Sequence, residues 1–220
     1  MNHRKPTELF FAGTDTEVGK TFVASLAART LSGQGKRVGV YKPVASGCYE
    51  EEGRRIAEDA VSLWEAAGRP KTLEQVCPQR FLAPLAPPEA AALEDSAVNT
   101  ELFTQGLEPW REDGDFLLIE GAGGLFSPLA EGVLNIDLIK QLNVEVILVA
   151  ANRLGVIHQT LACIEGAARR GVIIKGIVLN DADGQDDPSK ATNAEQIARY
   201  CNVPILDQVR YNAERTCALS

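Results

Sequence analysis

The sequence predicts an α/β fold in which a doubly wound, mainly parallel sheet is flanked by helices. Short apolar runs alternate with amphipathic stretches along the chain, which is the pattern of successive βαβ units. The runs are apolar at consecutive positions and often β-branched, as strands buried on both faces require. In such sheets ligands bind beyond the carboxyl ends of the strands, so functional residues are expected directly after each run.

The elements follow in order from these patterns. Buried strands are predicted over 9–12, 37–40, 116–119, 144–150 and 173–179. Helical periodicity predicts helices over 21–31, 57–67, 100–110, 136–142, 159–170 and 194–201. Several prolines interrupt the segment 69–96, and the acidic segment 181–189 is predicted to be a loop. No linker separates the elements, so residues 1–220 are predicted to form a single domain.

Composition argues against several classes of function. The formal net charge of −8 does not provide the basic face that nucleic-acid binding needs. No apolar run approaches the ~20 residues of a membrane span, and the first residues lack the apolar core of a signal peptide, so a cytoplasmic protein without membrane or nucleic-acid partners is expected. Five scattered cysteines and two histidines argue against a disulfide framework, a zinc site or a histidine-based triad.

The segment from Gly13 to Thr21, G-T-D-T-E-V-G-K-T, carries the strongest functional signal. It joins a predicted strand to a predicted helix and ends in Gly-Lys-Thr, as the phosphate-binding loop of P-loop NTPases does. Lys20 would reach the terminal phosphates of a nucleotide, and the Thr21 hydroxyl would face Mg²⁺. Five residues instead of four separate the two glycines, so Thr14 occupies the position of the first glycine. The alternative is an ordinary βα turn with a surface lysine.

Charged residues also follow two other predicted strands. Lys42 comes after the second strand and Glu120 after the third, so both would face the rim that carries the phosphate loop. Lys42 could join Lys20 around an anionic substrate, and Glu120 could contact magnesium. The alternatives are a solvated lysine at a strand end and an acidic βα turn.

Three further positions have weaker signals. Asp59 begins a predicted helix, where a carboxylate also interacts favourably with the helix dipole. Asn180 follows the fifth strand, and its amide either reads the edge of adenine or belongs to a turn. The segment 155–158 precedes a helix whose free N–H groups could bind a carboxylate. A lone histidine such as His158 is more often structural than catalytic.

These motifs resemble the dethiobiotin synthetase family. G-T-D-T-E-V-G-K-T, Y-K-P-V-A-S-G, E-D-A-V, E-G-A-G-G, R-L-G-V-I and V-L-N-D occur in the order of that family between residues 9 and 211. The first two motifs are highly specific, whereas E-G-A-G-G is shared with other phosphate-loop synthetases. The resemblance implies that CO₂ carboxylates one amine of 7,8-diaminopelargonate and that ATP phosphorylates the carbamate. The second amine then closes the ring, which gives dethiobiotin, ADP and phosphate.

The resemblance also implies roles for individual residues. Lys42 would neutralise the carbamate, Lys20 would reach the γ-phosphate, and Thr21, Asp59 and Glu120 would hold Mg²⁺. The nucleotide would be contacted by Glu17, Val18, Gly19, Lys20, Thr21, Phe22, Asp59, Glu120, Gly121, Ala122, Gly123, Asn180, Asp181, Val209, Arg210 and Tyr211. The substrate would be contacted by Thr16, Ser46, Gly155, Val156, Ile157 and His158.

The resemblance further implies a homodimer, in which the neighbouring subunit supplies a helix start for the tail carboxylate of the substrate. The segment 155–158 matches that region, although His158-Gln159 replaces an Asn-His pair common in the family. Arg210 stands where many members have proline. The competing interpretations are a cobyrinate-type amidotransferase synthetase and a partition-type ATPase switch. The switch usually has an additional lysine early in its loop, where this chain has 14–16, Thr-Asp-Thr.

Overall fold

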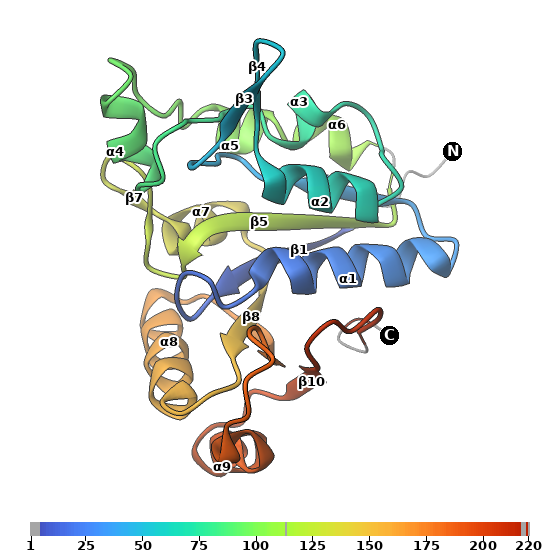
Figure 1. Cartoon of the computed structure of the whole chain (residues 1–220), viewed down its shortest axis with the longest axis vertical. Coiled ribbons are helices and arrows are strands. Elements are labelled where there is room, and N and C mark those ends of the chain that lie inside the picture. Colours follow the sequence, from blue (N-terminus) through green and yellow to red (C-terminus); the bar gives the residue numbers. More distant parts are fainter. Residues whose placement is uncertain (1–4, 113, 217–218, 220) are drawn as a thin grey trace.

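A six-stranded parallel sheet organises the molecule (Figure 1). The computed structural model describes residues 5–112, 114–216 and 219. The sheet has the order β10-β9-β8-β1-β5-β2. Its strands are β1 (Thr7–Gly13), β2 (Val38–Tyr41), β5 (Phe116–Gly124), β8 (Glu145–Ala151), β9 (Ile174–Asn180) and β10 (Ile205–Val209). The chain passes from β1 to β2 in one direction and from β5 to β8 in the other, so the direction of winding reverses between β1 and β5. Ligands bind at such a switch point. The predicted doubly wound α/β fold is confirmed.

The longer helices lie on the two faces of this sheet (Figure 1). α1 (Lys20–Gly33) and α2 (Glu58–Ala66) pack together on one face, against β1, β2 and β5. On the other face α7 (Asn135–Leu142) packs against β5, and α8 (Val156–Arg170) packs against β8. α9 (Asn193–Tyr200) packs against α8 near the β10 edge. This division follows from the right-handed crossover of parallel βαβ units, because the chain moves in opposite directions from β1 and from β5.

Shorter elements fill the connections. Two hairpins are formed by β3 (Tyr49–Glu51) with β4 (Arg54–Ile56) and by β6 (Pro128–Ala130) with β7 (Val133–Leu134). The short helices are α3 (Leu73–Val76), α4 (Pro87–Ala92), α5 (Leu102–Gln105), α6 (Glu108–Arg111) and the 3₁₀ turn η1 (Pro188–Ala191). The proline-rich segment 69–96 thus contains two short helices, and no longer element forms there.

The structure differs from the sequence-based prediction in three places. The helix predicted over 100–110 is wrong: α5 and α6 are separate, and between them Gly106 lies so close to Tyr41 that an added Cβ would be 2.2 Å from its hydroxyl. β10 escapes prediction because Asp207-Gln208 gives this edge strand a polar centre. β5 continues to Gly124, so Glu120 lies within the strand and not after it. The extension pairs Gly124 with Gly13 of β1.

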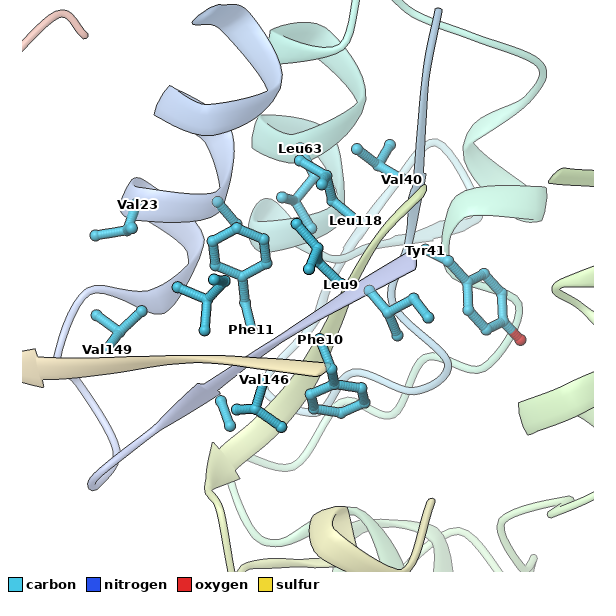
Figure 2. Close-up of a cluster of buried hydrophobic side chains, with 14 of the residues drawn as sticks. Leu9, Phe10, Phe11, Val23, Val40, Tyr41, Leu63, Leu118, Val146 and Val149 are labelled. Carbon is cyan, nitrogen blue, oxygen red and sulfur yellow. The ribbon is translucent and has the colours of Figure 1, made fainter. Parts of the chain in front are cut away.

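The core lies on both faces of the central strand (Figure 2). Phe10 and Phe11 are fully buried and point to opposite faces, as neighbouring residues in a strand do. Phe11 lies toward Val23 of α1, and Phe10 lies near Val146 of β8 on the other side. Since β1 is anchored on both faces, the loop that follows it starts from a fixed position.

The described residues contain no helix that is both long enough and apolar enough to cross a membrane. The four cysteines among them, at positions 48, 77, 163 and 201, are free thiols. Cys217 lies outside the described residues.

Candidate functional site

The loop between β1 and α1 has the geometry of a phosphate-binding loop. Gly19 adopts φ +82° and caps the start of α1, a conformation that L side chains rarely adopt. An added Cβ there would also lie 2.1 Å from the Asn180 amide nitrogen. Glu17 likewise has a positive φ of 56°. The tight backbone therefore leads into a helix start whose N–H groups favour anions.

Lys20 is the first residue of α1 and is 8% exposed. Burial lowers its pKa below the ordinary lysine value, while the nearby carboxylate of Glu120 acts in the opposite direction. The charge of Lys42 also lowers the pKa of Lys20, which places the two lysines within electrostatic reach of each other. An anion beside Lys20 would restore the preference for its charged form.

A buried ion cluster lies next to this loop. Lys42, directly after β2, donates from Nζ to Glu120 Oε1 at 2.6 Å and lies 3.0 Å from Asp59 Oδ2. Thr21 of α1 donates its hydroxyl to the same Glu120 oxygen at 2.8 Å. Lys42 and Glu120 are 3% and 1% exposed at the side chain, whereas Asp59 is 53% exposed. Thr21 and Lys42, from segments distant in sequence, therefore meet at the Glu120 carboxylate, as predicted for strand ends on a common rim.

Electrostatics keep this cluster charged. Burial alone would lower the pKa of Lys42, but the carboxylates of Glu120 and Asp59 outweigh it and raise that pKa above its ordinary value. The charge of Lys42 in turn lowers the pKa of Asp59 despite partial burial. Glu120 retains a second oxygen, Oε2, which is buried and has no hydrogen-bond partner within the described part of the chain. That oxygen is available to a cation.

A cavity of about 430 Å³ opens beside the loop and the cluster. It is lined by Glu17, Gly19, Lys20, Thr21, Phe22, Asp59, Asn180, Asp181, Ala182, Tyr211 and Asn212. Lys42 is not part of this lining. Its ammonium group contacts Asp59, and Asp59 lines the cavity wall.

Asn180, the last residue of β9, connects the far end of the cavity to the phosphate loop. Its side-chain nitrogen donates to the Val18 carbonyl at 3.0 Å. Its side-chain oxygen is buried and accepts no hydrogen bond from the residues that the structure describes. The neighbouring Asp181 accepts from Asn152 at 3.1 Å and lies 3.9 Å from Lys190. Asn180 therefore supports the loop with one atom and has a free acceptor on the other.

Other predicted nucleotide contacts lie less directly at the cavity. Val209 is buried within β10, and neither it nor Arg210 lines the wall, whereas Tyr211 does. Ala182 and Asn212 also line the cavity, although no motif in the sequence points to them. Asn212 has a positive φ of 57° in the turn that follows β10.

The glycines of E-G-A-G-G serve packing as well as approach to a ligand. An added Cβ on Gly121 would lie 1.9 Å from the Asn135 side-chain oxygen. Asn135 is buried and donates to the carbonyls of Ala122, Gly124 and Ser127. Gly123 has φ +68°. This internal role of Asn135 has no local signal in the sequence.

The predicted substrate residues fall into separate places. Thr16 lines another cavity of about 300 Å³, which shares Glu17, Asn180 and Ala182 with the first. Ser46 is half-buried in the segment after Lys42. The segment 155–158 forms the start of α8, with Gly155 as its N-cap at φ +94°, and lines neither cavity. The described structure therefore does not place 155–158 beside Lys20 and Lys42 in one cavity.

Comparisons with known proteins agree with this geometry. The family model described as "AAA domain" matches residues 7–216. ATP-dependent dethiobiotin synthetase BioD of Rhodopirellula baltica is 46% identical over 213 residues, which cover 91% of this chain and 83% of the relative. The proteins of the same name from Phenylobacterium zucineum and Bacillus subtilis are 39% and 38% identical, over 90% of this chain and 86% and 84% of the relatives.

Solved structures resemble the chain in fold. Chloroplast FtsY from Physcomitrella patens gives a TM-score of 0.52 at 18% identity and covers 97% of this chain. The signal recognition particle receptor FtsY from Elizabethkingia anophelis gives 0.52 at 17% identity and covers 93%. This chain spans 62% and 60% of those two chains. The phosphate loop, the buried ion cluster and the extent of the sequence matches lead to one assignment: the chain belongs to the ATP-dependent dethiobiotin synthetase family.

Proposed function

We propose that this chain catalyses the ATP-dependent formation of dethiobiotin from 7,8-diaminopelargonate and CO₂. One amine and CO₂ form a carbamate, whose oxygen attacks the γ-phosphorus and releases ADP. The second amine then attacks the resulting carbamic-phosphoric anhydride, so that the urea ring closes and phosphate leaves. The observation that carries the proposal is the placement of Lys42 between Glu120 and Asp59, beside Lys20 and Thr21 of the phosphate loop.

The proposed reaction has an electrostatic difficulty that these residues address. A carbamate anion must approach the γ-phosphate, which is also anionic. Lys20 at the start of α1 and Lys42 after β2 provide two cations whose charges influence each other. Because both are nearly buried, their fields act in a medium of low dielectric and need little reorganisation. No protein nucleophile is required, since positioning and fixed charge account for the chemistry.

The residues fit a bound Mg²⁺. Thr21, Asp59 and Glu120 offer a hydroxyl and two carboxylates, the all-oxygen donor set that Mg²⁺ prefers. The unpartnered, buried Oε2 of Glu120 is the observation that supports this fit. When bound there, the ion would offset phosphate charge and orient the transfer. Lys42, which contacts both carboxylates, would then turn its ammonium group toward the carbamate.

The base and the substrate tail have proposed positions as well. The free side-chain oxygen of Asn180 is an acceptor suited to the exocyclic amino group of adenine. Thr16 and Ser46 are proposed to contact the diamine end of the substrate. The N–H groups at the start of α8, at 155–158, are proposed to bind the tail carboxylate of a substrate held by the partner subunit of a homodimer.

The decisive experiment measures phosphate release with ATP, diaminopelargonate and bicarbonate, each omitted in turn. Phosphate release should require all three, and dethiobiotin should accumulate in equal amount. ATP turnover that needs neither the diamine nor bicarbonate, but rises with DNA or lipid, would instead identify a partition-type switch.

Substitution of Asn180 by alanine should weaken ATP binding by about 10- to 100-fold. The change removes the hydrogen bond that the Asn180 side chain donates to the Val18 carbonyl, and it removes the proposed acceptor for adenine. Each lost hydrogen bond in a buried site costs about 1–3 kcal/mol. Titration calorimetry with a non-hydrolysable ATP analogue measures the affinity. Gln208→Ala is a matched control, since this amide is exposed on the neighbouring strand. Equal affinity of Asn180→Ala and wild type would remove Asn180 from the nucleotide site.

A further inference from the structure

We infer that Gln79 is a positioning residue for Lys42 and Ser46, an inference that rests on the proposed function. Gln79 lies in the connection between α3 and α4 and touches neither cavity. It is nevertheless a buried residue, with only 8% of its surface exposed. A polar side chain buried in a connection needs partners for its polar atoms, and the side chain of Gln79 finds them at Pro43, directly after Lys42, and at Asn99.

The side-chain amide of Gln79 joins two other segments. Its nitrogen donates to the Pro43 carbonyl at 3.2 Å and to the Asn99 carbonyl at 3.1 Å. Its oxygen accepts from the Asn99 backbone nitrogen at 2.7 Å. One bond to the Pro43 carbonyl and two to the Asn99 backbone therefore link the residue after Lys42 to the approach to α5. Since the amide uses both its donor and its acceptor groups, a side chain without the donor would leave the buried Pro43 carbonyl without this partner.

Backbone hydrogen bonds continue the same attachment. Lys42 N donates to Val76 O at 2.8 Å, and Ala45 N donates to the carbonyl of Gln79 itself at 2.9 Å. Ala45 O accepts from Phe81 N at 2.9 Å. The segment from 42 to 48 thus lies along 76–83 without forming a named strand with it. Within 76–83, all of which the structure describes, Gln79 is the one residue whose side chain also donates to this segment.

This attachment bears directly on the proposed chemistry. Lys42 is the first residue of the segment, and its side chain extends into the ion cluster. Ser46 lies four residues further along the chain. Pro43 has no N–H, so its carbonyl is the one backbone group of this residue that can form a hydrogen bond, and Gln79 donates to it. A misplacement of about 1 Å in a catalytic group can reduce the rate about 100-fold. Gln79 is therefore expected to act on catalysis through the position of the segment, without touching the reactants.

The test compares Gln79→Ala and Gln79→Glu with wild type. Both variants should lower kcat by about 10- to 100-fold, while the Kd for a non-hydrolysable ATP analogue, measured by calorimetry, stays within about twofold, because the nucleotide cavity does not include Gln79. In Gln79→Glu the ionised carboxylate faces two carbonyls, but its protonated form restores one donor. The ratio of its kcat to that of wild type should therefore rise as the pH is lowered from about 8 to about 6, as burial raises the pKa of a carboxyl group.

Asn99→Ala is the matched control, because Gln79 contacts the backbone of Asn99 and not its side chain. It should leave kcat near the wild-type value. A purely structural role would lower the melting temperature of the Gln79 variants but leave kcat per folded molecule and its pH dependence unchanged, and that result would overturn the inference. If Gln79→Ala does not fold, the pH dependence of Gln79→Glu decides. Failure of the proposed function is distinct, since wild type itself would then form no dethiobiotin.

Discussion

Lys42→Ala is expected to lower kcat for dethiobiotin formation by about 10²- to 10³-fold, the effect of removing one preorganised charge from an active site. The same change should destabilise the protein, because it leaves Glu120 buried beside Asp59 without their shared cation. Breaking a buried ion pair in this way costs about 3–5 kcal/mol. Affinity for an ATP analogue should change far less than kcat, since Lys42 does not line the nucleotide cavity.

Steady-state kinetics, calorimetry and thermal melts measure the three effects. Lys175→Ala is the control, because Lys175 forms a 2.6 Å ion pair with Glu145 that is exposed and therefore weak. The pH dependence has a definite sign: a lysine with a raised pKa stabilises the fold below its unfolded pKa and ceases to do so as the pH rises through its folded pKa. The stability difference between Lys42→Ala and wild type should therefore narrow in strongly alkaline solution. Wild-type kcat in Lys42→Ala would remove this residue from the mechanism.

Lys20→Ala should reduce ATP-analogue affinity by at least about 100-fold and also abolish most turnover, because Lys20 is proposed to bind the terminal phosphates that both processes need. Its effect on stability should be opposite to that of Lys42→Ala. No ion pair of Lys20 is found within residues 5–112 and 114–216, and burial lowers its pKa. A buried lysine of this kind destabilises the fold at neutral pH, and that effect disappears above its unfolded pKa.

Thermal melts without nucleotide should therefore show Lys20→Ala to be as stable as wild type or more so, and the nucleotide-induced rise in melting temperature should be lost. The two lysines are a matched pair, since both are nearly buried and differ in having carboxylate partners. Unchanged affinity in Lys20→Ala, or a loss of stability as large as that of Lys42→Ala, would contradict the assignment of Lys20 to the phosphates.

The sequence predicts the parts of the site that depend on the order of strands. Lys20, Lys42 and Glu120 follow or end apolar runs, and parallel strands bring their carboxyl ends to one rim. Asp59 could not be distinguished from an ordinary helix-start acid by residue type, and its contact with Lys42 became visible in the structure. The roles of these residues in binding and catalysis remain predictions.

Parts of the structure that depend on single side-chain contacts were beyond sequence reasoning. Asn180 was expected to face the base, yet its amide nitrogen supports Val18 in the phosphate loop. Asn135 explains the small size required of Gly121, and Gln79 explains how the segment after Lys42 is held. Each contact joins positions far apart in the chain, and hydrophobic periodicity carries no information about such pairs. The edge strand β10 was missed because Asp207-Gln208 makes its centre polar, and a strand with one exposed edge tolerates such residues.

The strand order has one more consequence, which concerns how the protein could be re-engineered. The ion cluster comes from β2, α2 and β5 on one side of β1, whereas the far end of the cavity comes from β9 and the turn after β10 on the other side. Sequence libraries confined to 181–182 and 211–212 would therefore vary the far wall of the cavity, where the base is proposed to bind, while the residues proposed for phosphoryl transfer stay constant. Asn180 has to stay constant in such libraries, because its side chain ties the far half of the cavity to the phosphate loop.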